Sequence, residues 1–400
     1  MSSFNALPQL GSAAIREAYP RTYAAFCGMP EGEVWFERLV ELDLHRHRLL
    51  ATPQPMVVFG AASGPQSAVS ETFDVIVAGG CFGLIVGATL AAHYGWRVLV
   101  FDRHWVGRTH RDWNISRGEL QRLSEAGLFT PSEMEAFITA EYDGGFVKFH
   151  AEDCPIAAAP LWFDDVLTLA VSSDRLLAQC RQKLLAAGGS RCLDQATLEQ
   201  VQVEAEGVTV VVRQAEAGRL AFRGQLFIDT MGTLSPIARQ LNPRETVSYL
   251  CPTVGTIATG FATGSAADEV NARVGEILVT TGHAQDGRQL LWEGFAGRTG
   301  SLRPTCFTTR RWQTSGGCRC WRCLRRTLRR CPSTSGPERG LHFGGRCSGT
   351  FRAAPRGSGA AEADGGAPGV AAGRCGIVEF AVDVFAVLVR WCGTCGGSRI

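Results

Sequence analysis

Several residue types are absent from the last quarter of this chain. Residues 301–400 contain no Lys, Tyr, Asn or Met, although they hold 16 Arg and 5 acidic residues. Residues 1–300 carry 24 basic and 33 acidic side chains, so the net charge of +2 combines −9 in this part with +11 in the last hundred residues. Nine of the 15 cysteines also lie in those last hundred residues. The chain therefore joins two different compositions at about residue 300.

Long apolar runs are also missing. None reaches the roughly 18 residues that a membrane-spanning helix needs, which excludes a transmembrane protein. The apolar stretch 377–391 is too short and is broken by Glu379 and Asp383. No apolar segment follows a basic start, so we expect a protein that is not secreted. Six scattered cysteines in residues 1–300 suit a reducing compartment, and we expect a plastid or cytoplasmic location.

Residues 1–70 are predicted to be a helical lead-in followed by a linker. Helical periodicity covers 14–25 and 33–50. The apolar side chains near one face of the second segment are Trp35, Leu39, Leu42 and Leu49. Residues 51–70 are rich in Pro, Gly, Ser and Ala, which is typical of a linker. Beside the interpretation as helices that pack on the next domain, an organellar transit peptide stays open, because Ala, Ser and Arg are frequent at the start.

A strand, a glycine turn, a helix and a second strand follow one another from residue 73. Residues 73–78 form a short β-rich run, and the turn 79–83 leads into a stretch compatible with a helix through His93. A second β-rich run then ends in Asp102. This order within about thirty residues is the context in which a glycine motif indicates dinucleotide binding. We therefore expect an α/β fold with a Rossmann-like domain.

Each part of this unit has a chemical role. Gly80 lets the backbone approach a pyrophosphate, and Gly83 permits close packing of the helix on the strand. Asp102 is placed to accept hydrogen bonds from the adenosine ribose, although local capping is the other interpretation. The pattern departs from G-x-G-x-x-G at its first position, where Ala78 stands beside the flexible Gly79. The candidate cofactor-binding residues of this unit are Ala78, Gly79, Gly80, Cys81, Phe82, Gly83, Asp102 and Arg103.

Two capping boxes are expected after this unit. The first pairs Ser116 with Glu119, and the second pairs Thr130 with Glu133. Arg117 lies in the first helical turn, where a positive charge is unfavourable for the helix dipole. We interpret Arg117 either as a ligand for an anion or as an exposed loop residue.

A second strand-and-glycine-turn motif follows a meander. We expect a helix over 173–187 and then short strands over 198–204, 208–213, 220–223 and 226–228. The segment Ile228-Asp229-Thr230-Met231-Gly232-Thr233-Leu234-Ser235 again places an acid and a glycine turn after a strand. This order indicates backbone that passes close to a ligand.

The sequence of these motifs resembles FAD-dependent oxidoreductases of the hydroxylase and carotenoid-cyclase type. The segments Trp113-Asn114-Ile115-Ser116-Arg117 and 228–236 are similar to those of lycopene β/ε-cyclase-like flavoproteins of photosynthetic organisms, within a match over about residues 73–300. The resemblance implies that the first unit holds the ADP of FAD and that Arg117 lies near the pyrophosphate. It also implies that the Asp229/Gly232 turn flanks the flavin region and that 289–295 is a strand of a substrate domain.

An FAD-binding oxidoreductase or cyclase is the activity that this resemblance implies, with NAD(P)H as a candidate electron donor. The implied substrate is an isoprenoid or another hydrophobic small molecule. An NAD(P)-dependent dehydrogenase is the alternative, but a helix-and-meander insertion before residue 229, in place of continued βα alternation, favours FAD. A third class is a non-catalytic flavoprotein paralogue with a basic tail that binds nucleic acid. No residue can be named as a catalytic acid, base or nucleophile.

The tail allows three interpretations. Cys318, Cys320, Cys323 and Cys331 are not spaced as paired zinc ligands, so we predict no metal site. The Arg-rich tract 311–330 is of a kind that neutralises phosphates, which leaves nucleic acid as a less favoured partner. Translation of a GC-rich gene in a shifted frame explains more, because it yields much Arg, Gly, Ala, Pro and Cys and little Lys, Asn, Tyr or Met.

Codon junctions support the shifted frame. When the last base of each codon is joined to the first two of the next, the seven junctions from Leu302 to Thr309 permit T, T, Y, L/M, F, Y and Y. The related flavoproteins have a T-T-Y-x-F-x-Y strand at this place. Residues 389–396 in the same frame permit A, L/M/V, V, R, H, L and R, which resembles the helix after the family's C-terminal Gly-Asp motif. We therefore predict a frameshift near 296–302, an incomplete flavoprotein domain over 71–300 and an aberrant, poorly ordered tail over 301–400.

Overall fold

The strands that the structure describes form three sheets. In this computed structural model the described residues are 12–28, 31–51, 55–60, 68–109, 112–150, 159–165, 168–232, 235–241, 249–255, 257–259, 263–264, 271–280, 289–296, 302–311, 342–344, 350–351 and 387–389. The eight-stranded sheet has the order β1 (Val58–Gly60), β10 (Ala196–Glu204), β11 (Gly207–Gln214), β12 (Gly218–Asp229), β2 (Glu71–Ala78), β3 (Val98–Phe101) and β9 (Arg191–Leu193), with β20 (Val387–Val389) paired to β12.

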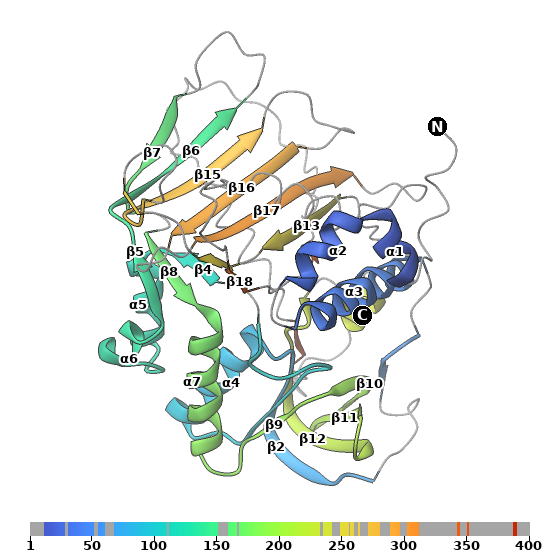
Figure 1. Ribbon diagram of the computed structural model, residues 1–400. Helices are drawn as coiled ribbons and strands as arrows, with labels where there is room; N and C mark the ends of the chain where they lie inside the picture. The colour runs from blue at the N-terminus through green and yellow to red at the C-terminus, as the bar shows by residue number, and fades with distance from the viewer. Residues whose placement is uncertain are drawn as a thin grey trace, which may run out of the picture.

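A nine-stranded sheet lies above the eight-stranded one in Figure 1. Its order is β18 (His342–Gly344), β14 (Ile257–Thr259), β17 (Leu302–Arg311), β16 (Gln289–Ala296), β15 (Val274–Thr280), β6 (Gly144–His150) and β7 (Pro160–Phe163), with β13 (Tyr249–Gly255) on β17 and β19 (Thr350–Phe351) on β13. The small third sheet has the order β4 (Asp112–Ile115), β8 (Leu169–Ser172) and β5 (Ile138–Glu141). The α/β architecture with an inserted meander and a second sheet is thus confirmed.

The parallel part of the eight-stranded sheet is built from strands that are apolar on both faces. β12, β2, β3 and β9 run parallel to one another. In β3, Val98 and Val100 belong to one core and Leu99 and Phe101 to the other. Burial on both faces is typical of parallel strands, and it explains why these short apolar runs could be read from the sequence as strands.

Two helices cover one face of this sheet. α4 (Phe82–Tyr94) and α7 (Ser173–Ala186) pack on each other and on the parallel strands, as Figure 1 shows at its lower left. α4 ends at Gly95, whose φ of 70° lies in the left-handed region that glycine favours, and the Gly95 amide donates to the Ala91 carbonyl. The other face carries a second core that includes side chains of β10, β11 and β12, and in it Phe73 of β2 and Phe222 of the neighbouring strand β12 lie edge to face at 6.0 Å. The predicted strands 220–223 and 226–228 are one continuous strand, β12.

The N-terminal segment forms α1 (Ser12–Ala18), α2 (Pro20–Cys27) and α3 (Gly32–Ala51). The single helix predicted over 14–25 is divided because Pro20 lacks an amide hydrogen and starts a new helix. On α3 the buried side chains are Phe36, Leu39 and Val40, whereas Trp35 is half-buried. Of the predicted face Leu39 is thus buried, Phe36 and Val40 extend the buried surface, and the side chains of Leu42 and Leu49 lie outside the described ones.

The predicted linker over 51–70 contains a strand. β1 pairs in parallel with β10, and Val57 before it is 4% exposed. The side-chain amide of Gln240, in α8 (Pro236–Leu241), accepts hydrogen bonds from the amides of Val57 and Val58, each at 2.8 Å. The Val-Val-Phe run thus forms β structure, because pairing and burial outweigh the flanking Pro and Gly residues.

Strand β17 lies on the far side of the domain boundary predicted at residue 300. It pairs antiparallel with β16 from Gln289↔Thr309 to Ala296↔Leu302. The strand predicted over 289–295 is present as β16. The boundary and the frameshift both stay predictions, since the pairing of β17 with β16 tests neither of them. The tail cysteines 318, 320, 323 and 331 lie outside the described residues.

The two capping boxes are confirmed. Ser116 caps α5 (Arg117–Glu125) together with Glu119, and Thr130 caps α6 (Pro131–Glu135) together with Glu133. Lys183 on α7 donates to Glu133 at 2.7 Å, and this bond is the main reason why the pKa of Glu133 falls to about 2. Among the helices that the structure describes, none is both long and apolar enough to cross a membrane.

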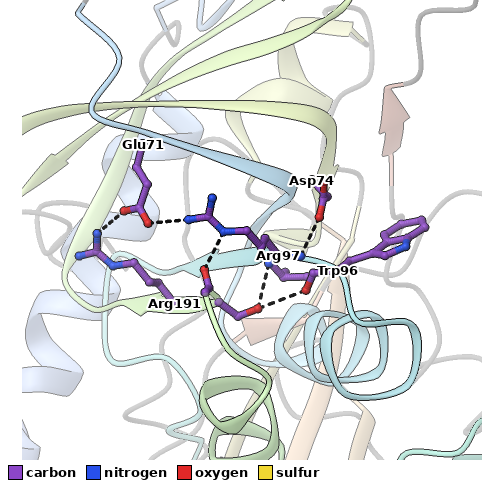
Figure 2. Close-up of polar contacts among 8 residues, drawn as sticks. Glu71, Asp74, Trp96, Arg97 and Arg191 are labelled. Carbon is purple, nitrogen blue, oxygen red and sulfur yellow. Dashed lines mark hydrogen bonds and ion pairs between the residues drawn. The ribbon is translucent and has the colours of Figure 1, made fainter.

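The amino-terminal edge of the parallel strands is closed by charged side chains (Figure 2). The carboxylate of Glu71, at the start of β2, pairs with Arg97 at 3.0 Å and with Arg191 at 2.5 Å. Asp74 accepts from the backbone amide of Arg97 at 2.8 Å. Figure 2 also shows the indole of Trp96 pointing away from these pairs. Each ion pair joins residues that lead into different strands of the sheet.

Candidate dinucleotide site

The candidate site lies at the carboxyl ends of four parallel strands. Ala78 is in register with Phe101 on one side and with Asp229 on the other, and Phe101 is in register with Leu193. From β2 the chain passes through α4 to β3 on one side, whereas β12 lies on the other side of β2. Ligands of open α/β sheets bind at such a switch point, outside the carboxyl ends of the strands.

The glycine turn after β2 depends on close contacts. Gly79 has a φ of 115°, and a Cβ there would lie 2.7 Å from the Thr230 carbonyl oxygen. A Cβ on Gly83 would lie 2.8 Å from Cγ1 of Val77. This is the close approach of helix to strand that the sequence predicted for Gly83. Larger residues at either position would force the two turns apart.

The N-terminus of α4 has no side-chain cap. The N-cap residue is Cys81, and its side chain makes no capping hydrogen bond. The Leu84 amide donates to the Cys81 carbonyl at 3.1 Å, but the first amides of a helix generally lack a partner within it, and the helix dipole adds positive potential at this end. Backbone amides in this position bind phosphate groups. Phe82, the first helical residue, stacks on Trp113 of β4 with ring centroids 5.2 Å apart and planes 5° apart.

Asp102 is bound to backbone amides on both of its oxygens. Oδ2 accepts from the Gly80 amide at 2.7 Å, and Oδ1 accepts from the His104 amide at 2.8 Å. The carboxylate thus forms a local turn with His104 and ties β3 to the glycine turn, whereas the N-cap of α4 is Cys81. Each carboxylate oxygen has a second acceptor site, so these bonds leave capacity for ribose hydroxyls. Arg103 beside it is exposed.

The turn after β12 is hydrogen-bonded to the turn after β2. The Thr230 amide donates to the Ala78 carbonyl at 2.8 Å, and the Thr230 hydroxyl donates to the same oxygen at 2.7 Å. Gly232 has a φ of 74°. The structure thereby brings together the two glycine motifs, which are about 150 positions apart in the sequence.

Asp229 builds this second turn from inside. It is 1% exposed, accepts from the Met231 amide at 2.9 Å, and accepts from the Ser235 hydroxyl. Burial raises the pKa of the Asp229 carboxyl, and the bonds from Ser235 and Met231 oppose that rise. Ser235 in turn accepts from the amides of Ile237 and Ala238 at the start of α8. Asp229 therefore shapes the turn through protein contacts.

Arg117 is engaged by two carboxylates. Its guanidinium donates to Glu141 at 3.0 and 2.8 Å and to Glu135 at 2.9 Å, and it is about half exposed. The bonds to Glu141 and then Glu135 raise the pKa of Arg117. A role near a pyrophosphate would require Arg117 to leave or share these ion pairs. That role stays a proposal.

Three contacts of the site were not predicted from the sequence. They are the Thr230 bonds to Ala78, the Phe82–Trp113 stack, and an ion pair between Arg181 and Asp194. Asp194 follows β9 directly, as Asp102 follows β3 and Asp229 ends β12. The sequence before Asp194, Arg191-Cys192-Leu193, is too short and too polar to mark a strand, so only the position of Asp194 after the double glycine 188–189 was a local signal.

Comparison with known proteins yields structural likeness and no sequence match. No protein-family model matches the chain, and a search of curated proteins finds no match. A geranylgeranyl bacteriochlorophyll reductase-like protein from Thermoplasma acidophilum is similar in structure at 16% identity, with a TM-score of 0.47 over 70% of this chain and 66% of that one. The p-nitrophenol 4-monooxygenase PnpA from Pseudomonas putida is similar at 15% identity, with a TM-score of 0.48 over 70% and 69%.

The halogenase PltM, in complex with phloroglucinol and FAD, is similar at 17% identity, with a TM-score of 0.46 over 68% of this chain and 60% of that one. This chain spans less than two thirds of the reductase-like protein and of the halogenase. Likeness at this level concerns the fold, so the function below is argued from the site itself.

Proposed function

We propose that this chain is an FAD-binding, oxidoreductase-like protein. The observation that carries the proposal is the pairing of two glycine turns, 78–83 and 229–232, at the switch point of the parallel sheet. One turn opens a helix without a side-chain cap, and the acid at the end of the neighbouring strand reaches back to it. A backbone cradle with an adjacent carboxylate suits an anion that is linked to a diol.

The residues present fit the ADP half of the cofactor. The first amides of α4 would hold the pyrophosphate, and the remaining acceptor sites of Asp102 would receive the ribose hydroxyls. The Asp229/Gly232 turn would lie along the flavin-bearing half, since Thr230 fixes it against Ala78. Glycine at 83 keeps the helix close enough to the strand for its amides to face the ligand.

FAD is favoured over NAD(P) by the insertion between the two turns. Residues 112–187 supply the small third sheet and α5–α7 together with β6 and β7, instead of continuing the βα alternation of a plain dehydrogenase. An NAD(P)-dependent dehydrogenase is the alternative. FAD, when bound, would supply the redox chemistry, and the residues of this chain would bind it, orient it and exclude water.

The substrate is proposed to be a hydrophobic small molecule of the isoprenoid kind, as the lycopene-cyclase-like motifs imply. NAD(P)H is the proposed electron donor where the reaction is a net reduction. A non-catalytic paralogue with a basic, nucleic-acid-binding tail is the competing class. It predicts a folded domain without flavin and a salt-sensitive affinity for nucleic acid that is lost when 301–340 is deleted.

The test is a binding measurement on the purified chain with its frame restored after Arg298, because the chain as written is expected to hold FAD poorly or to misfold. Titration with FAD, NAD+ and ADP in parallel separates the proposals. Saturable binding of ADP and FAD, together with weaker binding of NAD+, supports the flavoprotein. Tighter binding of NAD+ than of FAD favours the dehydrogenase, and failure to bind any of the three refutes a dinucleotide site.

A further inference from the structure

The two members of one ion pair bind the amide and the carbonyl of Val106, a residue in the loop after β3. Arg181 on α7 and Asp194 after β9 form a two-pronged pair, with both nitrogen–oxygen distances at 2.9 Å. Asp194 also accepts from the Val106 amide at 2.8 Å, and Arg181 donates to the Val106 carbonyl at 2.9 Å. The side chains of Arg181 and Asp194 are only 31% and 19% exposed. Burial raises the pKa of Asp194, but the bonds from Arg181 and Val106 outweigh it and leave that pKa below its ordinary value.

Val106 in turn lies against the glycine turn. A Cβ on Gly80 would lie 2.8 Å from Cα of Val106, and the Gly107 amide donates to the Gly80 carbonyl at 2.8 Å. Because Gly80 has no side chain, the protein's own loop at Val106 and Gly107 can lie against it. From the sequence we predicted that this position lets the backbone approach a pyrophosphate. Gly80 is thus contacted by the loop through its carbonyl and by Asp102 through its amide.

The segment that carries Asp194 also holds the other end of the loop. The Asp102 amide donates to the Leu193 carbonyl at 3.2 Å, and the Ala196 amide donates to the Asp102 carbonyl at 2.7 Å. The Gln195 amide donates to the His104 carbonyl at 2.7 Å. Residues 193–196 thus fix Asp102 through the backbone and Val106 through the Asp194 side chain.

We propose that Arg181 and Asp194 are positioning residues of the dinucleotide site. They hold the loop 102–107 against Gly80, and through it they set the carboxylate of Asp102 for the ribose of an ADP group. This inference rests on the proposed function and assigns the pair to the adenosine half of the ligand. Neither residue is expected to touch the ligand.

ADP binding to the full-length chain tests this assignment. ADP is the probe because the loop, the glycine turn and Asp102 all face the ADP half of the proposed cofactor. Calorimetry would compare the wild type, Asp194→Asn, Asp102→Asn and the double variant. We expect Asp194→Asn to weaken ADP binding about tenfold, the size of one lost hydrogen bond to a charged group. The double variant should bind ADP no more weakly than whichever single variant has the lower affinity, because both changes act through Asp102.

Glu204→Gln is the matched control. Glu204 accepts from Arg223 at 2.7 Å, with a side chain 25% exposed, and it pairs within the meander of the same sheet. We expect that variant to bind ADP within about twofold of the wild type. Losses that simply add in the double variant, or an equal loss in Glu204→Gln, would overturn the assignment, since the pair would then act only on general stability.

Hydrogen exchange without ligand provides a readout that does not depend on ADP. In Asp194→Asn the amides of Val106, Gly107 and Gly80 should exchange faster, while that of Val210 in β11 stays unchanged. Unchanged exchange at Gly80 overturns the assignment. If Asp194→Asn does not fold, Arg181→Lys keeps the cation, loses the two-pronged geometry and takes its place in both measurements. A folded wild type that binds no ADP overturns the proposed function and this assignment together, whereas additive losses overturn the assignment alone.

Discussion

The two edges of the parallel sheet are held by different kinds of contact. At the amino edge, side chains meet side chains: Glu71 bridges Arg97 and Arg191, and these arginines are 47% and 49% exposed. At the carboxyl edge, backbone also bonds backbone: the Thr230 amide donates to Ala78 and the Gly107 amide donates to Gly80, beside the side-chain bonds of Asp102 and Thr230. Exposed ion pairs contribute little to stability, whereas close backbone contacts tolerate no added atom. The comparison indicates that the amino edge tolerates substitution and that the carboxyl edge does not.

Restoring the reading frame of the C-terminal quarter should have the largest effect on flavin binding. We predict that the chain as written holds FAD poorly or misfolds, and that a version with the frame restored after Arg298 co-purifies with flavin. A ligand that binds only the native state at a hundredfold excess over Kd adds about 2.7 kcal/mol of stability, so the restored protein should also melt at a higher temperature. The measurement is flavin absorbance across the monomer elution peak of both proteins. If the chain as written elutes as a compact monomer with stoichiometric flavin, residues 301–400 belong to the fold.

Gly83→Val should abolish dinucleotide binding. The new side chain would meet Val77 and Thr230 and drive α4 away from β2, at a cost of about 1–3 kcal/mol in stability. Gly118→Ala is the control, because a Cβ there has no atom within 4 Å. The check is ADP titration together with urea unfolding. Binding at the wild-type affinity would mean that the glycine turn serves only the fold.

Asp102→Ala should weaken FAD or ADP by about 1–3 kcal/mol, the scale of losing a charged hydrogen-bond acceptor. Asp74→Ala is its counterpart at the amino edge, since Asp74 also accepts a backbone amide, that of Arg97. We expect Asp74→Ala to lower stability without changing ligand affinity. Equal effects of the two variants on affinity, measured by calorimetry, would remove the distinction between the edges.

Glu71→Gln should have the smallest effect. Its two ion pairs are solvent-exposed, so we expect a loss of roughly 1 kcal/mol or less in the free energy of unfolding. High salt should reduce the difference from the wild type, because it screens the pairs. Urea unfolding at two salt concentrations gives both values. A marked loss of ADP affinity in this variant would contradict the division between a structural edge and a ligand edge.

The elements read most accurately from the sequence are those with local signals. The strands β2 and β3, the helix α4 and both capping boxes were predicted, because continuous apolar runs, glycine turns and Ser/Thr–Glu pairs act within a few residues. The sequence predicts a linker at β1, because its flanking residues favour turns. Its pairing partner β10 lies about 140 positions away, so no local pattern indicates the strand. On α3 the sequence pattern included the buried Leu39 but missed Phe36, which packs edge to face with Phe26 of α2 at 5.6 Å.

The sequence by itself determined which backbone could approach a ligand. Glycine at 79, 80 and 83 and an acid after β3 are choices of residue type, and their chemistry follows from having no Cβ or having a carboxylate. Only the tertiary structure decided what those residues meet. In the folded chain Thr230 is hydrogen-bonded to Ala78, and Val106 lies where a side chain at Gly80 would be. Arg117 forms an ion pair with Glu141, and Arg181 forms one with Asp194. Such contacts depend on the pairing of distant strands, which no local pattern encodes, because a strand's partner is chosen by the packing of the whole sheet.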